Sequence, residues 1–177
     1  MELRADGFTL RPWEAGDAAA VTELCQDPEI ARWIPFIPSP YTEADARAFI
    51  EQSQSTWELE EAYGFAIVED AGELLGAIGM RMRRFRTGHI GYWVAAHARG
   101  RGVASDALRA LSRWAIEELG LKRLELVTDP ENVASQRVAE KAGFRREGIL
   151  RSALEYRDGS RSDSVVFSLL PEELGGA

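Results

Sequence analysis

The chain has little cysteine or histidine and no long apolar segment. Among its 177 residues are one cysteine and two histidines. Because Cys25 has no second cysteine to pair with, no internal disulfide can form, which is typical of a reducing compartment. The few scattered His and Cys residues predict no metal site. There is no run of about 18 apolar residues and no export signal, so we expect a cytoplasmic protein with no membrane partner.

Positive charge is also scarce. The chain has 21 Lys and Arg residues against 29 Asp and Glu residues, a formal net charge of −8. This balance disfavours general binding to a phosphate backbone and favours a cationic partner, so we expect no nucleic acid to bind. The arginine-rich run at residues 81–86 alternates as a half-exposed strand does, and we interpret it as one.

Apolar periodicity and turn residues predict alternating strands and helices in a single domain of residues 1–177. The predicted strands are 8–11, 65–69, 74–84, 89–94, 123–128, 144–156 and 161–170. The predicted helices are 17–26, 42–62, the segment from the loop after Val94 to Leu119, and 132–142. Residues 29–40, rich in proline and aromatic side chains, are expected to be a loop, and residues 172–177 a loose tail. This order implies the α/β class, with a mixed sheet and helices on both faces.

A basic, glycine-rich loop between a strand and a helix is the most informative segment. It reads RGRGVAS and covers residues 99–105. Glycines let successive backbone N–H groups converge, and the following helix adds its own free N–H groups and the positive end of its dipole. The loop therefore predicts a site for phosphate or pyrophosphate. It lacks the third glycine of a dinucleotide-binding loop, where Ser105 stands, and the lysine of a P-loop.

A second motif follows the strand at 123–128. The segment DPENVASQRVAEKAGF places Asn132 and Ser135 in the first turn of a short helix, which ends at a Gly-Phe pair. Together with the Arg-x-x-Gly-x-Ala spacing of the basic loop, it resembles the coenzyme A loop and the N-x-x-S…K-x-GF segment of GNAT N-acetyltransferases of the RimJ/RimL type. The resemblance continues in order along nearly the whole chain, from FTLRPWEAGDAAAV to LEYRDGSRSDSVVFSLLPEE.

This resemblance implies a central mixed, mostly antiparallel sheet with helices on both faces. It also implies an acetyl-CoA-dependent N-acetyltransferase that uses no metal. Pantetheine would lie where the strands ending at Val94 and Thr128 diverge, and the pyrophosphate would lie at the glycine loop. The residues that the resemblance assigns to coenzyme binding are Trp93, Val94, Arg99, Gly100, Arg101, Gly102, Val103, Ala104, Ser105 and Asn132.

Two residues are candidates for the chemistry. In RimL-type enzymes the serine that matches Ser135 lies near the coenzyme sulfur and is proposed to protonate it; the alternative is a serine that caps the helix. Glu155 matches a glutamate that could orient or deprotonate the amine; the alternative is a strand carboxylate facing water. One extra residue between Leu150 and Glu155 requires a bulge, or else Glu155 turns to the other face. His89 is a further candidate base, or a solvent-facing residue at the start of a strand.

The acceptor is expected to be a primary amine that reacts directly with acetyl-CoA in a ternary complex. A protein N-terminal amine needs only about 1.4 kcal/mol to become neutral at pH 7, whereas a lysine-like amine needs roughly 4.6 kcal/mol. The resemblance also points to a protein N-terminus, with a small-molecule amine as the alternative. Trp33, Phe36 and Tyr92 are candidate acceptor-binding residues. Two other classes stay open, a non-catalytic acyl-CoA-binding module and a nucleotide-binding oxidoreductase, and so does a homodimer.

Overall fold

An eight-stranded sheet forms the centre of the molecule. The computed structural model describes residues 1–175. Its strands are β1 (Leu3–Ala5), β2 (Phe8–Pro12), β3 (Ala62–Glu69), β4 (Leu74–Arg83), β5 (Thr87–Val94), β6 (Arg123–Thr128), β7 (Arg145–Glu155) and β8 (Arg161–Leu169). They lie in the order β1-β2-β3-β4-β5-β6-β8-β7, and each neighbouring pair is antiparallel except β5 with β6. The predicted mixed, mostly antiparallel sheet is confirmed; β1 is a strand that the sequence pattern did not predict.

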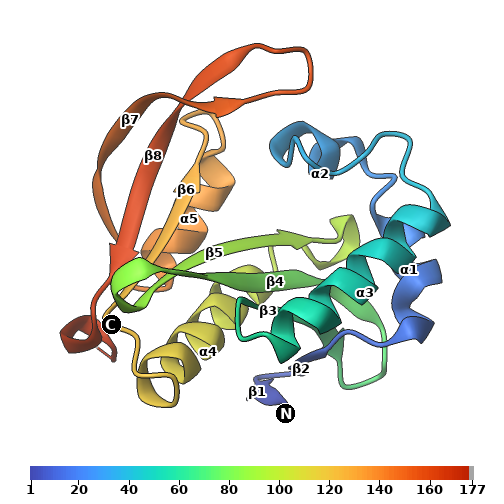
Figure 1. Ribbon diagram of the computed structural model, residues 1–177, viewed down its shortest axis with the longest axis horizontal. Helices are drawn as coiled ribbons and strands as arrows, with labels where there is room; N and C mark the ends of the chain where they lie inside the picture. Colours follow the sequence, from blue (N-terminus) through green and yellow to red (C-terminus); the bar gives the residue numbers. More distant parts are fainter. Residues whose placement is uncertain (176–177) are drawn as a thin grey trace.

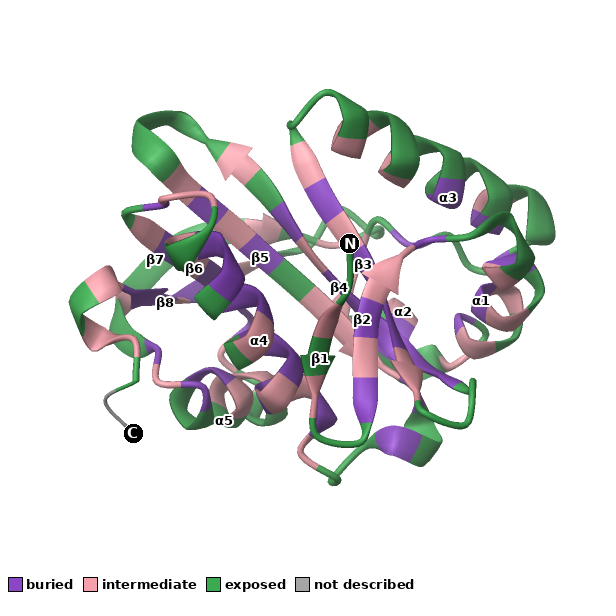
Figure 2. Ribbon diagram, turned by 90° about the horizontal axis from the view of Figure 1, so that it is seen from below, coloured by how far each residue is buried: buried purple, intermediate pink, exposed green. Residues whose placement is uncertain are grey.

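Helices cover both faces of the sheet (Figure 1). One face carries α1 (Ala18–Leu24), α2 (Pro28–Trp33) and α3 (Glu43–Glu58), and the other carries α4 (Val103–Glu117) and α5 (Val133–Lys141). Successive side chains of a strand point to opposite faces of the sheet, so one strand contributes to the apolar core on each face. Phe65 and Ile67 pack toward α4, while Ala66 packs toward α3. Figure 2 shows the outer turns of α3 exposed and the sheet beneath them largely buried.

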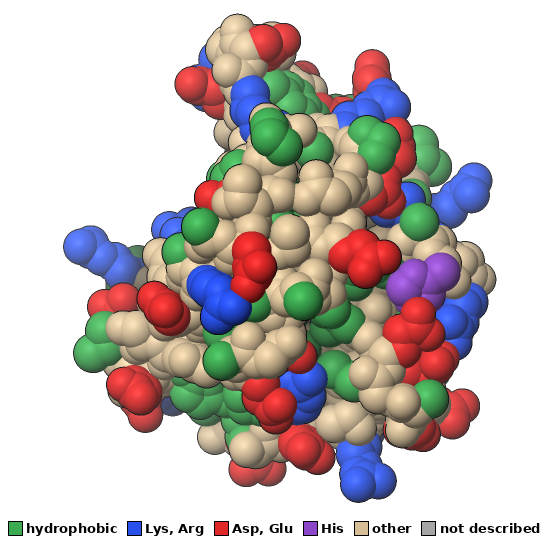
Figure 3. All heavy atoms as spheres, turned by 90° about the vertical axis from the view of Figure 1, so that its right-hand side faces the viewer, with side chains coloured by type: hydrophobic (Ala, Val, Ile, Leu, Met, Phe, Trp, Pro, Cys, Tyr) green, Lys and Arg blue, Asp and Glu red, His purple; other side chains and the backbone are tan. Residues whose placement is uncertain are grey.

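Helix α3 begins where the sequence predicts and ends earlier. The hydroxyl of Thr42 accepts the N–H of Asp45, and the Asp45 carboxylate accepts the N–H of Thr42, a reciprocal cap. The helix ends at Glu58 rather than near Ala62, because the chain from Ala62 onward pairs with β4. The outer side of α3 is polar, and Figure 3 shows Asp and Glu side chains spread over this side of the molecule.

The predicted loop at residues 29–40 is wrong in its first part, which belongs to α2. Asp27 caps this helix by accepting the N–H of Glu29, and Pro28 takes the first helical position, where a missing N–H costs no hydrogen bond. Ile30 then buries its side chain in the core. A proline alone predicts a break, but directly after a capping aspartate it begins a helix.

The predicted loose tail is also partly wrong. Pro171–Glu173 form a 3-10 turn, and Leu174 packs against the main core. The Glu173 carboxylate accepts the N–H of Leu170 and pairs with Arg145 at 2.8 Å. Residues 176–177 of the predicted tail lie outside the described residues.

Strands β5 and β6 run parallel but are paired only where they begin. Residues 87–89 lie opposite residues 123–125, and beyond these positions the two strands part (Figure 1). The partners on either side stay in place: β4 follows β5 as far as Val94, and β8 follows β6 as far as Thr128. The sheet therefore opens at the carboxyl ends of β5 and β6, where no strand within residues 1–175 pairs with the facing strand edges.

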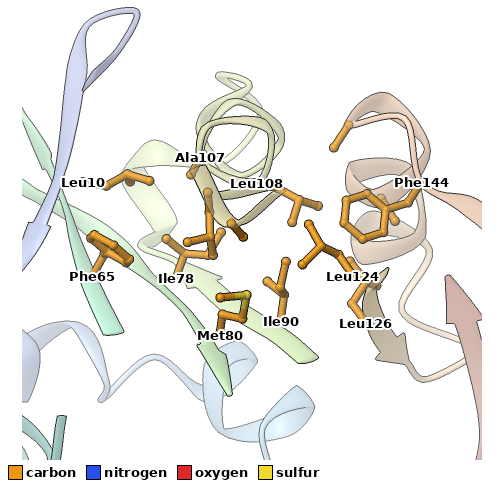
Figure 4. Packing of buried hydrophobic residues seen from close by; sticks show 14 of the residues in the cluster. Leu10, Phe65, Ile78, Met80, Ile90, Ala107, Leu108, Leu124, Leu126 and Phe144 are labelled. Carbon is orange, nitrogen blue, oxygen red and sulfur yellow. The ribbon is translucent and has the colours of Figure 1, made fainter. Parts of the chain in front are cut away.

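The core beneath this opening is filled by apolar side chains. Figure 4 shows Ile78, Met80 and Ile90 below Leu108 of α4, with Leu124 and Leu126 beside Phe144. Each of these side chains is buried. Close packing of these side chains between the sheet and α4 holds β5 and β6 in their diverging positions.

Candidate active site

The glycine loop lies where the chain leaves β5 and enters α4. Gly100 and Gly102 have φ angles of 75° and 87°, a left-handed conformation that a β-carbon disfavours. Gly102 directly precedes the first residue of a 15-residue helix, so loop N–H groups and a helix N-terminus meet at one place. Ser105 donates its hydroxyl to the carbonyl oxygen of Gly102 at 2.8 Å and fixes this turn. The loop therefore has the backbone geometry that an anion site needs.

Both loop arginines are ion-paired within the chain. Arg99 donates to the Asp27 carboxylate at 2.6 Å and to the carbonyl oxygen of Val94 at 3.2 Å. Arg101 pairs with Glu69. Since carboxylates already offset both guanidinium charges, an anion in the loop depends first on backbone N–H groups. Because Asp27 is the N-cap of α2, Arg99 also ties the glycine loop to that helix.

Two hydroxyl groups meet across the opening between β5 and α5. The phenol of Tyr92 donates to the carbonyl oxygen of Ser135 at 3.2 Å, and its oxygen lies 3.0 Å from Ser135 Oγ. Asn132 caps α5 by accepting the N–H of Ser135 at 3.0 Å, so the serine hydroxyl is not the cap. Burial raises the pKa of Tyr92 to about 12. Both hydroxyls are therefore protonated at neutral pH and can hold or donate a proton at Ser135 Oγ.

The other residues assigned to coenzyme binding act through backbone and packing. Trp93 packs against the layer below α1 and α3, and Val94 packs against the layer below α4. The backbone of Val94 faces the opening, because β6 is no longer paired there, whereas the backbone of Trp93 faces Ala77 of β4. Val103 is buried and Ala104 half-buried in the first turn of α4. The structure thus brings the glycine loop, the end of β5, Asn132 and Ser135 to one opening.

A cavity of about 490 Å³ lies beside this opening. It is bordered by α2, the segment after β6 and the turn between β7 and β8, which face one another in Figure 1. Trp33 lines the cavity, and Arg32 stacks on its indole with 4.4 Å between the guanidinium carbon and the ring centre. Phe36 is 84% exposed and outside the lining. Tyr92 is directed at Ser135 rather than at this cavity.

The structure does not bring Glu155 or His89 to the cavity. The β7–β8 register is irregular between Leu150 and Leu154, where four residue steps on β7 lie opposite the two steps from Ser164 to Ser162 on β8. Glu155 is exposed and pairs with Arg161, while the next residue, Tyr156, lines the cavity. His89 lies at the paired end of β5, 3.6 Å from Glu125, and burial lowers its pKa.

A carboxylate that the motifs did not single out lies in the cavity wall. Asp129 directly follows β6, is 7% exposed, and accepts the hydroxyl of Tyr156 and the N–H of Glu131, each at 2.7 Å. Burial opposes its ionisation, yet hydrogen bonds from Ser162, Tyr156 and the Glu131 N–H lower the pKa of Asp129. Burial and this carboxylate raise the pKa of Tyr156 to about 12. The sequence feature that could have indicated Asp129 is its position directly after a strand, because ligands bind at the carboxyl ends of strands in open sheets.

Comparison with known proteins decides the family. Residues 8–145 match a family model described as "Acetyltransferase (GNAT) domain". The chain belongs to the GNAT acetyltransferase family. "Uncharacterized N-acetyltransferase p20" of Bacillus licheniformis is 31% identical over 178 residues, covering 98% of each chain. The ribosomal-protein-serine acetyltransferase of Escherichia coli is 31% identical over 138 residues, 77% of this chain and 74% of the relative. The structure of Mycobacterium smegmatis RimJ in complex with CoA-disulfide has a TM-score of 0.88 and 27% identity, covering 99% of this chain and 88% of that one.

These similarities confirm the RimJ/RimL resemblance. This GNAT acetyltransferase is an acyltransferase, so the non-catalytic module and the oxidoreductase are set aside. Within residues 1–175, no group of three or more His, Cys, Asp or Glu side chains could hold a metal ion. In that same part of the chain, no helix has the length and apolar character needed to cross a membrane.

Proposed function

We propose that this GNAT acetyltransferase transfers the acetyl group of acetyl-CoA directly to the N-terminal amine of a protein. One observation carries the proposal. The opening between β5 and β6 has an anion-binding glycine loop at its end, and the hydroxyls of Tyr92 and Ser135 meet across it.

The residues around the opening fit coenzyme A. The N–H groups at residues 100–105 suit its pyrophosphate, and the N–H of Val94, on the edge of β5 that β6 leaves, suits an amide of its pantetheine arm. Trp93, next to Val94, and Asn132, the cap of α5, complete the residues assigned to this arm. Bound acetyl-CoA supplies a thioester, an acyl group activated for attack by an amine. The complex of M. smegmatis RimJ with CoA-disulfide supports this assignment.

Ser135 is the proposed donor of the proton that the departing thiolate needs. A neutral amine forms the new C–N bond as the C–S bond breaks, so the sulfur gains a proton and the amine loses one. Ser135 Oγ can donate that proton, while the Tyr92 phenol, 3.0 Å from Ser135 Oγ and 3.2 Å from the carbonyl oxygen of the same residue, holds the serine in place. The buried Cys25 is not part of the opening, which supports direct transfer without an acetylated cysteine.

The N-terminal amine is favoured by what lines the cavity. Neither Glu155 nor His89 reaches it, so an acceptor that is partly neutral without a base suits the site. About a tenth of N-terminal amines are neutral at pH 7, against about one lysine amine in 2,500. The name of the E. coli relative, a ribosomal-protein-serine acetyltransferase, supports a protein acceptor.

An acceptor screen with release of coenzyme A thiol tests this proposal. The panel contains peptides with a free N-terminal Ser or Ala, the same peptides blocked at the N-terminus but carrying one lysine, and a polyamine. We expect kcat/KM for the free N-terminus to exceed that for the blocked lysine peptide at least tenfold. Better turnover of the polyamine would establish the small-molecule alternative. If no amine is acetylated and acetyl-CoA does not raise the melting temperature, the proposed function is wrong.

A further inference from the structure

The cavity beside the opening has acidic and basic groups on several elements. Three carboxylates line it, those of Asp129, Glu131 and Asp158. The guanidinium groups that line it come from α2 and from the segment joining β7 to β8; they are Arg32, Arg157 and Arg161. The three negative and three positive charges therefore balance. A ligand is attracted by those charged groups that have no partner of opposite charge within the protein.

The arginines are already engaged. Arg32 lies 3.9 Å from Glu29 and 3.8 Å from Glu131, and it stacks on Trp33. Arg157 donates to the carbonyl oxygen of Pro35 at 3.1 Å, which joins the β7–β8 turn to the segment after α2. Arg161 pairs with Glu155 and donates to the carbonyl oxygen of Ser152. The three arginines thus contact groups of the protein that surround the cavity.

Two of the three carboxylates, those of Glu131 and Asp158, lie at the exposed edge of the cavity and already have partners. The Glu131 side chain is 80% exposed and faces Arg32. Asp158 is exposed and accepts the N–H of Ser160 inside its own turn at 2.9 Å. Neither is held in a fixed position in the cavity wall, and water screens both.

Asp129 differs from both in burial and in support. It is 7% exposed, and its two carboxylate oxygens are held by the Tyr156 hydroxyl and the Glu131 N–H. Its carbonyl oxygen accepts the N–H of Asn132 at 3.0 Å, and the Asn132 side chain accepts the N–H of Ser135. This short series of bonds fixes the carboxylate relative to the hydroxyl that we assign to the departing thiolate.

We infer that Asp129 is the acceptor-binding group of the site, a fixed carboxylate that receives the ammonium form of an alkyl amine in the cavity between α2 and the β7–β8 turn. The inference rests on the proposed function and adds a subsite to it. A buried carboxylate attracts a cation more strongly than an exposed one, because the local dielectric constant is lower. Trp33 adds an aromatic wall beside this point.

Asp129 binds the amine but does not deprotonate it. Its pKa is lowered, so near neutral pH it accepts a hydrogen bond without taking up a proton. Tyr156, whose pKa is raised to about 12, remains a donor to the carboxylate over the same range. Arg32, Glu131, Arg157, Asp158 and Arg161 are the other charged groups that line the cavity, and of these Arg32 also helps to lower the pKa of Asp129; we assign the proton to none of them. The ammonium proton leaves to solvent, and the rate then follows the pKa of the acceptor itself.

The test compares a cationic and a neutral acceptor on Asp129→Asn. Asparagine keeps an oxygen for the Glu131 N–H and removes the charge. With a peptide bearing a free N-terminus, we expect acceptor KM to rise at least tenfold, with kcat and the KM for acetyl-CoA within threefold. An aromatic amine of low pKa is neutral at pH 7, so its KM should change less than threefold. A purely structural role would raise KM for both acceptors alike, and that result overturns the inference.

Two further variants complete the experiment. Asp158→Asn removes a negative charge from the rim of the same cavity and should change acceptor KM less than threefold. Tyr156→Phe keeps the Asp129 charge but removes one of its donors, and it should raise KM for the cationic peptide less than Asp129→Asn does. In wild type, kcat/KM should rise with pH up to the pKa of the peptide amine, without a second rising limb near pH 6. If wild type acetylates the peptide while a folded Asp129→Asn binds it normally, the inference fails and the proposed function stands.

Discussion

At the residue scale, Ser135 is the group whose removal should affect chemistry most. Ser135→Ala should lower kcat by about a hundredfold, typical of lost acid–base catalysis, and leave the KM for acetyl-CoA nearly unchanged. Steady-state kinetics with one acceptor peptide measures both values. Tyr92→Phe should give a smaller loss, because Ser135 keeps its hydroxyl and loses only the contact that directs it. Ser55→Ala, on the exposed side of α3, is the control. A loss below threefold in Ser135→Ala, with chemistry rate-limiting, would leave the serine only as a partner of Tyr92.

Glu155 gives a second prediction at this scale. Its carboxylate pairs with Arg161 and is 63% exposed, so Glu155→Gln should change kcat and acceptor KM less than threefold at pH 7. The rival prediction from the sequence, that Glu155 is the base, requires a slow variant at pH 7 that partly recovers at pH 9, where more amine is neutral. Rates measured at both pH values decide between the two.

The residues that the sequence reveals are those whose role depends on neighbours along the chain. The glycines of the loop before α4 and Thr42 as a cap act within a few residues, so a motif contains the needed information. The sequence predicts Asn132 only as a coenzyme contact, and the structure shows that it caps α5. Asp129 and Tyr156 meet only through the pairing of β6, β8 and β7. The irregularity of β7 between Leu150 and Leu154 is defined by its pairing with β8, so a pattern within β7 does not locate it.

At the element scale, the loop between β5 and α4 should fail when its backbone is constrained. Gly102 has a φ of 87°, and an added Cβ would lie 3.3 Å from the Asp106 carboxylate. Gly102→Val should therefore weaken acetyl-CoA binding at least tenfold, about 1.4 kcal/mol, as measured by calorimetry. Gly120→Val is the matched control, because Gly120 has a φ of 66° and lies just after α4, at the opposite end of that helix from the loop. Equal affinity for wild type and a folded Gly102→Val would remove the loop from the coenzyme site.

The helices and strands were largely predictable, and the exceptions are β1 and α2. Strands and long helices follow from apolar period and from local caps. Helix α2 was not predicted, because its sequence is short and begins with proline. Besides its local cap and the buried Ile30, α2 has a tertiary contact, the ion pair of Asp27 with Arg99 across 72 residues. The residues of α2 alone do not predict a contact with an arginine so far away in the sequence.

At the scale of the whole molecule, acid should weaken the contact between the edge strand β7 and β6. Arg123 on β6 donates to both carboxylate oxygens of Glu147 on β7, at 2.7 and 2.6 Å, and lowers the pKa of Glu147 to about 2. Because the folded pKa lies below the ordinary value of 4.5, the stabilisation is complete above about pH 4.5 and is lost as the pH falls toward 2. Denaturant midpoints measured from pH 6 to pH 3 should fall less steeply in Glu147→Gln. Parallel curves for the two proteins would contradict this.

The assembly state belongs to this scale too, and the homodimer stays a prediction. Strand β7 is at the edge of the sheet and leaves Ile149 and Leu150 about half exposed, at 49% and 51%. Sedimentation at several concentrations measures the mass directly, and a mass that stays at one chain would show a monomer.

The single thiol offers a reporter of the fold as a whole. Cys25 is 4% exposed beneath α1, and burial raises its pKa to about 12. Only the thiolate reacts readily, so an aromatic disulfide reagent should modify the native protein at least a hundredfold more slowly than the unfolded chain at pH 8. The labelling rate should rise with denaturant along the same curve as tryptophan fluorescence, because opening the layer under α1 and α3 requires most of the domain to unfold. Saturating acetyl-CoA should slow labelling further, since a ligand that binds only the folded state lowers the unfolded fraction. Rapid labelling of the native protein would show instead that α1 opens by itself, and would separate this layer from the core below α4.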